Sequence, residues 1–463
     1  MNARKPSDPS SGGDPSSPPT RRDFLRSTTA ATASFIAGAG AMARAQEQPA
    51  APPPTPAPTQ EQPPPPPPPP PPRPEPMVKI GFIGIGGMGR EHINRFLALH
   101  QESKENVRIV ALSDVCKPRL DEAAEYCAQQ QAENGQPAAM QLHRDYRELL
   151  LNPDVQGVLI ASPEHWHSQM AIDAIRAGKD VYLEKPMTLR LDDAFALWRE
   201  QRNSDRIVQI GTQYVMQPKY AEAKRLVGEG TIGHPVSSQT SYCRNTPIGE
   251  WNYYPIDDRV KPGETLDWER WCGPLGTVPF DTFIFHRWRR YKRFSTGIIG
   301  DLLVHMMTPL IWALDCGWPV RVTATGGHYV DKAMENHDQV HLTVQFEKEH
   351  TMDVLGSTCN STGFEILIRG NKANLFLGGN NCELRPEAPY AEQVEGQSAK
   401  FESVPDHDLM RMNWLHCIRT REPNQSPVAL ATKVMVVVDL ATRALWEGHT
   451  WGFSPASLTA FPL

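Results

Sequence analysis

The sequence has little of three features that would each point to a class of protein. Its charge is not one-sided, because the formal net charge is only −6 and acidic and basic residues are interspersed, so no basic face suggests nucleic-acid binding. Its eight cysteines lie far apart, with no CxxC or zinc-type spacing. After residue 46, no apolar run approaches the roughly 20 residues that span a bilayer. A nucleic-acid partner, a cysteine-based zinc site and a stable membrane span are therefore not expected.

Residues 1–45 have the layout of an export signal. A basic pair, Arg21 and Arg22, precedes an apolar stretch over residues 30–42 and then a small-residue A-x-A site. The paired arginines, followed by Asp-Phe-Leu-Arg, resemble the twin-arginine signal, whose translocon carries folded proteins. We therefore expect export to the periplasm, a soluble mature protein that begins near Gln46, and buried free thiols. The alternative is a basic tail ahead of an Ala-rich helix.

Residues 46–76 form a proline-rich segment, with unbroken proline from Pro63 to Pro72. Such a composition cannot bury much apolar surface, and its prolines favour the polyproline II helix, which rises about 3.1 Å per residue. We expect a stiff linker. An arm that lies across a neighbouring subunit is the alternative.

The rest of the chain, which is 463 residues long in total, is ample for two domains. Short apolar runs, the first over residues 78–83 and the second over 107–112, alternate with amphipathic helical stretches. This alternation predicts βαβ units and a parallel sheet over residues 77–205. Strand-like alternation, as in residues 340–346, predicts a second, α+β domain on a mostly antiparallel sheet over residues 206–463.

The first apolar run leads directly into a glycine-rich loop of the GxGxxG type. The first glycine of such a loop permits a tight turn, the second lets a pyrophosphate approach the backbone, and the third lets the following helix pack on the strand. The N-terminus of that helix then offers unpaired N–H groups to the phosphates. With a strand before it and a helix after it, the loop predicts dinucleotide binding. Its residues are Gly84, Ile85, Gly86, Gly87, Met88 and Gly89.

Asp114 lies 25 positions after Gly89, at the end of the second predicted strand. A carboxylate there can accept hydrogen bonds from the adenosine ribose hydroxyls and would repel a 2′-phosphate, so NAD is preferred over NADP. Lys117 and Arg119 are near enough in the sequence to keep NADP as an alternative. A turn residue that ends a strand is the plain structural interpretation.

The stretch ASPEHWHSQ follows another predicted strand of the parallel sheet. Ligands of such sheets lie beyond the carboxyl ends of the strands, so we expect Ser162, His165 and Trp166 to contact the cofactor. His165 and His167 could suggest a metal ion, but zinc needs three or four ligands and the sequence anchors no third one. We therefore expect no metal site, and a cofactor contact or a helix cap by His167.

The stretch LEKPM follows the next predicted strand and places Glu184 and Lys185 beside the expected nicotinamide. A lysine near a reacting alcohol can donate to its oxygen and stabilise the alkoxide that develops there. A surface lysine before a helix that begins at proline is the alternative interpretation.

Asp301 and His305 lie four positions apart in an otherwise apolar predicted helix. Because residues i and i+4 share a helix face, we expect the Asp301 carboxylate to hydrogen-bond one imidazole nitrogen and leave the other as a base. Two polar side chains on such a helix must be paired or used. A satisfied structural pair is the alternative.

In this order, the motifs resemble the glucose-fructose oxidoreductase and inositol dehydrogenase family, called Gfo/Idh/MocA. The resemblance extends from Val78 nearly to the C-terminus and rests on GxGxxG, EKP, the GTQ of residues 211–213, GTIGHP and DxxxH. It implies a Rossmann domain followed by an α/β domain whose open sheet faces the cofactor and often forms an oligomer interface, hence a dimer or tetramer. It also implies that Lys185 is the catalytic lysine and that Asp301 with His305 forms the acid–base pair.

The aromatic stretch from ETLDWERWCGP to FHRWRRY resembles an exported subgroup that acts on sugars or glycosides. We expect hydride transfer between a sugar and a tightly bound nicotinamide cofactor. A related branch of NAD-dependent glycosidases tends to lack the EKP lysine, so Lys185 favours net redox chemistry. Cleavage by transient oxidation and a non-catalytic sugar-binding protein are the rival hypotheses. The expected substrate contacts are Tyr242, Arg287, Trp288 and Arg289, although such aromatics serve equally well in packing.

Overall fold

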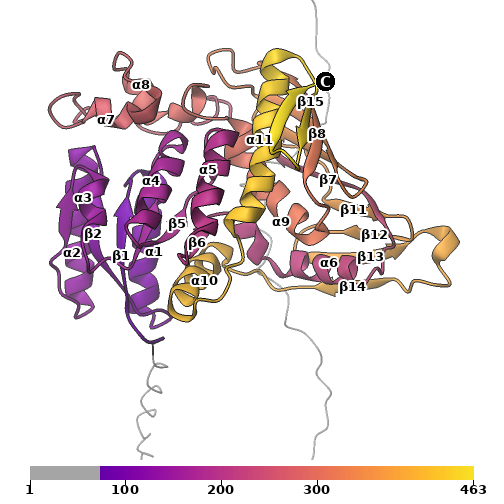
Figure 1. Ribbon diagram of the computed structural model, residues 1–463, viewed down its shortest axis with the longest axis horizontal. Coiled ribbons are helices and arrows are strands. Elements are labelled where there is room, and N and C mark those ends of the chain that lie inside the picture. The colour runs from indigo at the N-terminus through magenta and orange to yellow at the C-terminus, as the bar shows by residue number, and fades with distance from the viewer. Residues whose placement is uncertain (1–72) are drawn as a thin grey trace, which may run out of the picture. The chain divides into compact units, whose positions relative to one another are not determined.

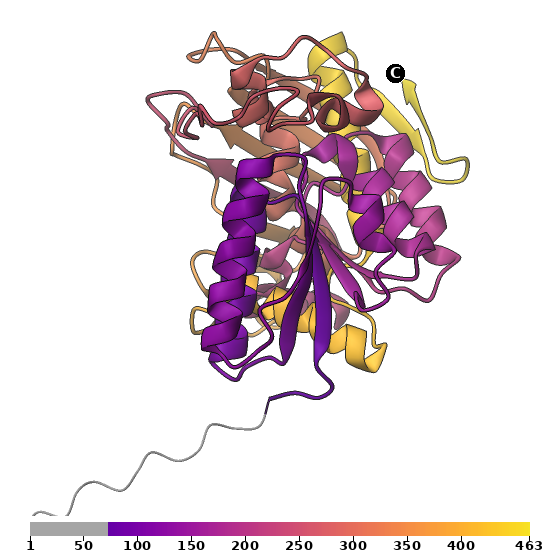
Figure 2. The same ribbon diagram turned by 90° about the vertical axis from the view of Figure 1, so that its left-hand side faces the viewer.

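The computed structural model describes residues 73–463, so the expected signal and most of the proline-rich segment lie outside the described residues. Six short strands form a parallel sheet in the order β3-β2-β1-β4-β5-β6, and Figure 2 shows its strands with helices on both sides. Strands covered on both faces are buried along their length, as all four residues of β4 are. The strands are β1 (Val78–Ile83), β2 (Val107–Ser113), β3 (Gln141–His143), β4 (Gly157–Ile160), β5 (Asp180–Leu183) and β6 (Val208–Ile210).

The strand order of this sheet reverses between β1 and β4. The loops that follow these two strands therefore diverge and leave a crevice at the carboxyl edge, where ligands of doubly wound sheets bind. The predicted parallel sheet is confirmed. Its helices are α1 (Gly87–Gln101), α2 (Lys117–Glu133), α3 (Tyr146–Leu150), α4 (Glu164–Arg176) and α5 (Leu191–Arg202).

The second sheet has ten strands in the order β14-β13-β12-β11-β7-β10-β9-β8-β15-β16. Among the described strands of this sheet only β7 and β10 pair in parallel, which confirms the mostly antiparallel prediction. Along β9 buried and exposed residues alternate, so one face of the sheet is covered and the other is open. The strands are β7 (Pro235–Cys243), β8 (Pro319–Gly327), β9 (Gln339–Phe346), β10 (His350–Ser357), β11 (Leu367–Gly370), β12 (Ala373–Phe376), β13 (Asn381–Pro386), β14 (Gln397–Lys400), β15 (Trp451–Ser454) and β16 (Thr459–Pro462).

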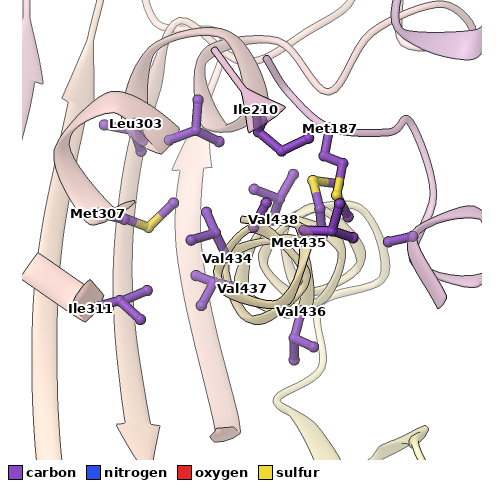
Figure 3. Packing of buried hydrophobic residues seen from close by; sticks show 14 of the residues in the cluster. Met187, Ile210, Leu303, Met307, Ile311, Val434, Met435, Val436, Val437 and Val438 are labelled. Carbon is purple, nitrogen blue, oxygen red and sulfur yellow. The ribbon is translucent and has the colours of Figure 1, made fainter. Parts of the chain in front are cut away.

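Helices α6 (Pro218–Gly228), α9 (Val304–Leu314) and α11 (Val428–Glu447) pack on this second sheet. Figure 3 shows α11 within a hydrophobic cluster, with Met307 of α9 on one side and Met187, from the loop after β5, on the other. Burying one such side chain contributes about 1.5–3 kcal/mol. Helix α11 therefore joins the parallel sheet to the second sheet. None of the helices in residues 73–463 is long and apolar enough to cross a membrane.

Helix α10 (Asp406–Thr420) comes late in the chain but packs on the parallel sheet. The Trp414 ring lies edge-on to Phe96 and Tyr182, at centroid distances of 6.2 and 5.8 Å. A Cβ at Gly157 of β4 would lie 2.9 Å from the Trp414 ring, so only glycine allows this close approach. The core of the first domain therefore includes a segment from beyond the predicted boundary at residue 205.

Between β7 and α9 the chain makes a long excursion with only short helices. We call residues 254–294 the strap, and Figure 1 shows its helices α7 and α8 beyond the ends of α3 and α4. The amide of Lys117 donates to the Thr265 carbonyl at 2.8 Å, and the amide of Asp267 donates to the Val115 carbonyl at 3.1 Å. These bonds tie the strap to the carboxyl end of β2. Its helices are α7 (Trp268–Cys272), η2 (Gly273–Leu275), α8 (Thr282–His286) and η3 (Trp288–Arg290).

Candidate active site

The glycine loop folds as its spacing predicts. Gly84 has a φ of +85°, and a Cβ there would lie 2.6 Å from the Ser162 amide nitrogen. A Cβ at Gly89 would collide with the Gly84 carbonyl oxygen. Within residues 73–463, no side chain caps the N-terminus of α1, which begins at Gly87, so its N–H groups stay free for phosphate oxygens.

A cavity of about 380 Å³ lies between this loop and the strap. It fits a dinucleotide for two reasons. The glycines of the loop line it without side chains that would fill it, and the neighbouring Ser162 Oγ is buried without a hydrogen-bond partner in residues 73–463. Gly84, Gly86, Gly87, Met88, Asp114, Ser162 and Trp166 line it from the Rossmann side, and Tyr254, Trp271, Phe285, Trp288 and Arg289 are among the residues that line it from the strap.

Asp114 lines this cavity and also shapes it. Its Oδ2 accepts a hydrogen bond from the Ile85 amide at 2.6 Å, and its Oδ1 accepts one from the Cys116 amide at 2.7 Å. A carboxylate has about four acceptor sites, so Asp114 can fix the loop and still bind ribose hydroxyls. Arg119 also lines the cavity, with its guanidinium over the Phe285 ring at 4.5 Å.

Of the residues expected in the turn after β4, Ser162 and Trp166 line the cavity but His165 does not. His165 Nε2 lies 2.9 Å from the Trp271 carbonyl oxygen, and burial lowers the pKa of His165 to about 4. His165 therefore holds the strap rather than a cofactor. His167 is also buried, with one ring nitrogen 2.7 Å from the Pro186 carbonyl and the other 2.8 Å from that of Ser162. No group of three potential metal ligands occurs among the described residues.

Lys185 and Asp301 form a buried ion pair between the two domains. Lys185 Nζ donates to Asp301 Oδ1 at 2.8 Å and to the Asp301 carbonyl at 2.9 Å. Arg289 Nε donates to the same Oδ1 at 2.9 Å, and Trp251 Nε1 donates to Oδ2 at 3.2 Å. Burial alone would raise the pKa of Asp301, but the charges of Lys185 and Arg289 hold it well below its usual value. Asp301 is therefore an ionised acceptor.

The hydrogen bond expected between Asp301 and His305 is not formed, and this prediction was wrong. Residues Ile299–Leu303 form a π-helical turn before α9, in which side chains four apart no longer lie directly above one another. Two cations also compete for the carboxylate. His305 is buried, with Nδ1 unpartnered within residues 73–463. Burial first, and then the charge of Lys185, lowers the pKa of His305 to about 3, so its imidazole is neutral.

The four expected substrate contacts divide into two pairs. Trp288 and Arg289 line the cavity, and Arg289 connects it to Asp301. Arg287 instead donates to the Asn252 side chain at 3.2 Å, and the Tyr242 hydroxyl accepts a hydrogen bond from Arg244 at 2.9 Å. The strap therefore lines the cavity with Tyr254, with Trp271 of α7 and with residues of its last turns.

Comparison with protein families decides the identity of the fold. Residues 78–212 match the model "Oxidoreductase family, NAD-binding Rossmann fold", and residues 224–452 match "Oxidoreductase family, C-terminal alpha/beta domain". The chain belongs to the Gfo/Idh/MocA family. It contains the NAD-binding Rossmann domain of this oxidoreductase family, as the resemblance implied.

Individual members of the family share modest identity with the chain. The scyllo-inositol 2-dehydrogenase (NAD(+)) of Bacillus subtilis (strain 168) is 28% identical over 74% of this chain and 83% of its own length. The glycosyl hydrolase family 109 protein 1 of Shewanella sp. (strain ANA-3) is 28% identical over 51% of this chain, and the match spans about half, 48%, of the relative. A solved levoglucosan dehydrogenase, in complex with NADH and levoglucosan, has a TM-score of 0.60 at 17% identity and covers 83% of this chain and 99% of its own, which shows a common fold.

Neither the glutamate nor the lysine of the EKP motif lines the cavity, although a cofactor contact was expected of both. Glu184 Oε1 lies 2.8 Å from His92 Nε2, and His92 Nδ1 accepts from Arg411 Nε at 2.9 Å. Because Arg411 only donates, Nδ1 is unprotonated and Nε2 carries the hydrogen. Burial opposes ionisation of Glu184, but His92 and Lys185 lower its pKa to about 2. A Cβ at Gly211 would lie 2.9 Å from Glu184 Oε1, which explains the glycine of the GTQ motif.

Sequence reasoning missed Glu164, which begins α4. Its side chain is buried, accepts from Ser295 Oγ at 2.5 Å and from the Thr296 amide at 3.2 Å, and so joins the Rossmann domain to the segment before Asp301. Burial is the main cause that raises its pKa to about 7. In the sequence it looks like an ordinary acidic residue in the first turn of a helix, and only the tertiary contact distinguishes it.

Replacing Glu164 by Gln is expected to flatten the pH dependence of stability. The folded pKa of about 7 exceeds the ordinary value of 4.5, so the folded protein keeps a proton that the unfolded chain releases. The stabilisation is complete below pH 4.5 and is lost as pH rises to 7, a fall of about 3 kcal/mol in the free energy of unfolding. Urea titrations from pH 4.5 to 7.5 measure this slope. The exposed Glu133→Gln is the control, and an unchanged slope in Glu164→Gln would contradict the assignment.

Proposed function

We propose that this protein transfers a hydride between NAD and a sugar or sugar derivative outside the cytoplasm. The NAD stays bound to the protein from one turnover to the next. The observation that carries the proposal is the arrangement of Lys185. An ammonium group has three donors, and Asp301 takes two of them through its carbonyl and its carboxylate. One N–H is left for a substrate oxygen.

The side chains of the site have complementary tasks in this reaction. When bound, NAD supplies the hydride acceptor or donor. His305, which is neutral, takes the proton of the substrate hydroxyl as a general base. Lys185 stabilises the negative charge that remains on that oxygen. Asp301 stays ionised and holds Lys185 in place.

A sugar or cyclic polyol is the substrate class that the surroundings favour. Trp288, at the cavity, offers an aromatic face to sugar C–H groups, and Arg289 offers donors to hydroxyls. The relatives named above include an inositol dehydrogenase and a levoglucosan dehydrogenase. By the same resemblance we propose that the protein is a dimer or tetramer through the open face of the second sheet, which light scattering would test.

The position of the strap favours a cofactor that stays bound, because the strap covers the cavity beside the glycine loop. Trp166 Nε1 donates to the Trp271 carbonyl at 3.0 Å and thereby closes the strap on the Rossmann domain. Retention would suit an enzyme that the twin-arginine pathway exports folded, since NAD bound in the cytoplasm would travel with the protein. Turnover would then pair the oxidation of one sugar with the reduction of another.

Gly273→Ala is expected to loosen this closure and to speed NAD release by at least about tenfold. Gly273 has a φ of +50°, and a Cβ there would collide with the Trp166 ring. Gly276→Ala is a matched control, because Gly276 also has a positive φ, of +76°, but its Cβ would meet no atom closer than 4.0 Å. Stopped-flow dissociation of NADH gives the rates. Equal rates in the two variants would show that the strap does not retain the cofactor.

The proposed function is tested first by the nucleotide that the protein carries. Full-length protein expressed with its own signal is recovered from the periplasm and denatured, and the released nucleotide is assayed. We expect near-stoichiometric NAD, followed by turnover with paired sugars and no added cofactor. Protein recovered empty, or active only with added NAD, would refute retention and leave an ordinary dehydrogenase reaction.

Glycoside cleavage by transient oxidation is the second candidate, favoured by the similarity to the glycosyl hydrolase family 109 protein. It predicts release of nitrophenol from nitrophenyl glycosides with no net change in the cofactor. Lys185 is present in this chain, which favours net redox chemistry. Nitrophenol release that depends on His305 would reverse that preference.

A further inference from the structure

Trp251 combines two features that rarely occur together in a protein. Its backbone has a φ of +63°, in the left-handed region that large aromatic residues avoid. Its side chain is almost completely buried, with 1% of its surface exposed. A bulky residue held in such a conformation costs about 1–3 kcal/mol, and such costs are typically found at functional sites.

The neighbouring residues force this conformation on Trp251. Glu250 is fully buried, and its carboxylate accepts from Arg244 at 2.7 Å, from Thr246 at 2.6 Å and from the Tyr253 hydroxyl at 2.9 Å. The Glu250 carbonyl also accepts from Arg290 at 2.7 Å. Anchors on both sides of Trp251 therefore fix the direction of its indole ring.

The indole ring points at the carboxylate that holds the catalytic lysine. Both cations of the site, Lys185 and Arg289, donate to Asp301 Oδ1. Trp251 Nε1, at 3.2 Å, is the one donor to Oδ2 within residues 73–463. A carboxylate bound on one oxygen alone can turn about its Cβ–Cγ bond, and a donor on the second oxygen opposes that rotation.

We propose that Trp251 is a positioning residue for the proposed reaction: its indole N–H fixes the rotation of the Asp301 carboxylate, and thereby the direction of the free N–H of Lys185. The inference rests on the proposed function for its kinetic consequence. The contact between Trp251 and Asp301 can be tested independently of any substrate.

Trp251→Phe keeps an aromatic ring but removes the N–H, and leaves Asp301 Oδ2 buried without a donor. We expect kcat to fall by about ten- to a hundredfold, as for the loss of a hydrogen bond to a charged group, while KM changes by less than twofold. Scyllo-inositol and levoglucosan are the substrates tried first. The matched control is Trp414→Phe, because Trp414 is equally buried and its Nε1 has no partner in the described residues. Its kcat should stay within twofold of wild type.

A double-mutant cycle and a spectroscopic measurement separate positioning from general packing. If Trp251 acts through Asp301, Trp251→Phe should cause no further loss of kcat in an Asp301→Asn background. In ¹⁵N-tryptophan-labelled protein, the Trp251 indole resonance, assigned by its loss in Trp251→Phe, should shift in Asp301→Asn while that of Trp414 does not. Additive losses, a kcat within twofold of wild type in folded Trp251→Phe, or an unmoved resonance would each overturn the inference. Should neither compound be turned over, the resonance alone decides the inference, and only the proposed function is put in doubt.

Discussion

Lys185→Met is expected to lower kcat by about a thousandfold and to leave a folded protein that still binds NAD. The loss is large because the one free N–H of Lys185 would face the oxygen that becomes negative, and removing such a donor typically costs about 10² to 10³ in kcat. The fold should survive, because Arg289 and Trp251 continue to satisfy the Asp301 carboxylate. Steady-state kinetics and NADH fluorescence titration provide the two measurements.

Lys179→Met is the matched control for this substitution. Lys179 is also a buried lysine of the Rossmann domain, but its ammonium donates to the carbonyls of Asn152 and Val155, outside the cavity and the Lys185 ion pair. Its loss should reduce stability and leave kcat nearly unchanged. If Lys185→Met kept more than a tenth of the wild-type kcat, the proposed role of Lys185 would be wrong.

Arg411→Met is expected to have the largest effect on stability, a loss of about 3–5 kcal/mol in the free energy of unfolding. Arg411 is buried, with 1% of its surface exposed, and donates to His92 and to Asp408, at 2.9 and 2.8 Å. Removing one member of a buried charged network leaves its partners desolvated without compensation, and this loss is of the size measured for such cases. Because His92 holds Glu184, NAD affinity should fall as well. Urea denaturation and calorimetric titration measure the two effects.

The control for this variant is an arginine in an exposed ion pair. Arg385→Met breaks the pair with Glu383 on the second sheet, where both side chains are open to solvent, and such pairs contribute little to stability. A loss in Arg411→Met as small as that in Arg385→Met would mean that the buried network contributes little to the joining of α1 and α10.

The cofactor half of the site could be read from the sequence because its requirements are local. Gly84 and Gly89 are needed by a turn and a close packing within a few residues of each other, and Asp114 reaches the loop from the neighbouring strand. Strand, loop and helix follow one another along the chain, so periodicity and glycine spacing identify them together. The same holds for the position of Lys185 at the carboxyl end of β5.

The catalytic half could be read only in part. Spacing identified Asp301 and His305 as unusual on an apolar helix, but the expected bond between them assumed regular α-helical geometry, and the chain forms a π-helical turn there. The Asp301 carboxylate accepts from Lys185, Arg289 and Trp251 instead of from His305. None of these three donors lies within one helical turn of Asp301 in the sequence. No periodic pattern predicts such contacts.

By itself, the sequence determined the parallel sheet, the glycine loop and the mostly antiparallel second sheet, because apolar periodicity and glycine spacing are visible along the chain. The catalytic roles of Lys185, Asp301 and His305 stay a prediction. Only the tertiary structure decided that α10 completes the Rossmann core, that the strap covers the cavity, and that His165 and Glu184 support the site without lining the cavity. These features depend on which buried polar atoms find partners when distant segments pack together. That choice is made by burial and geometry, which a one-dimensional pattern does not contain.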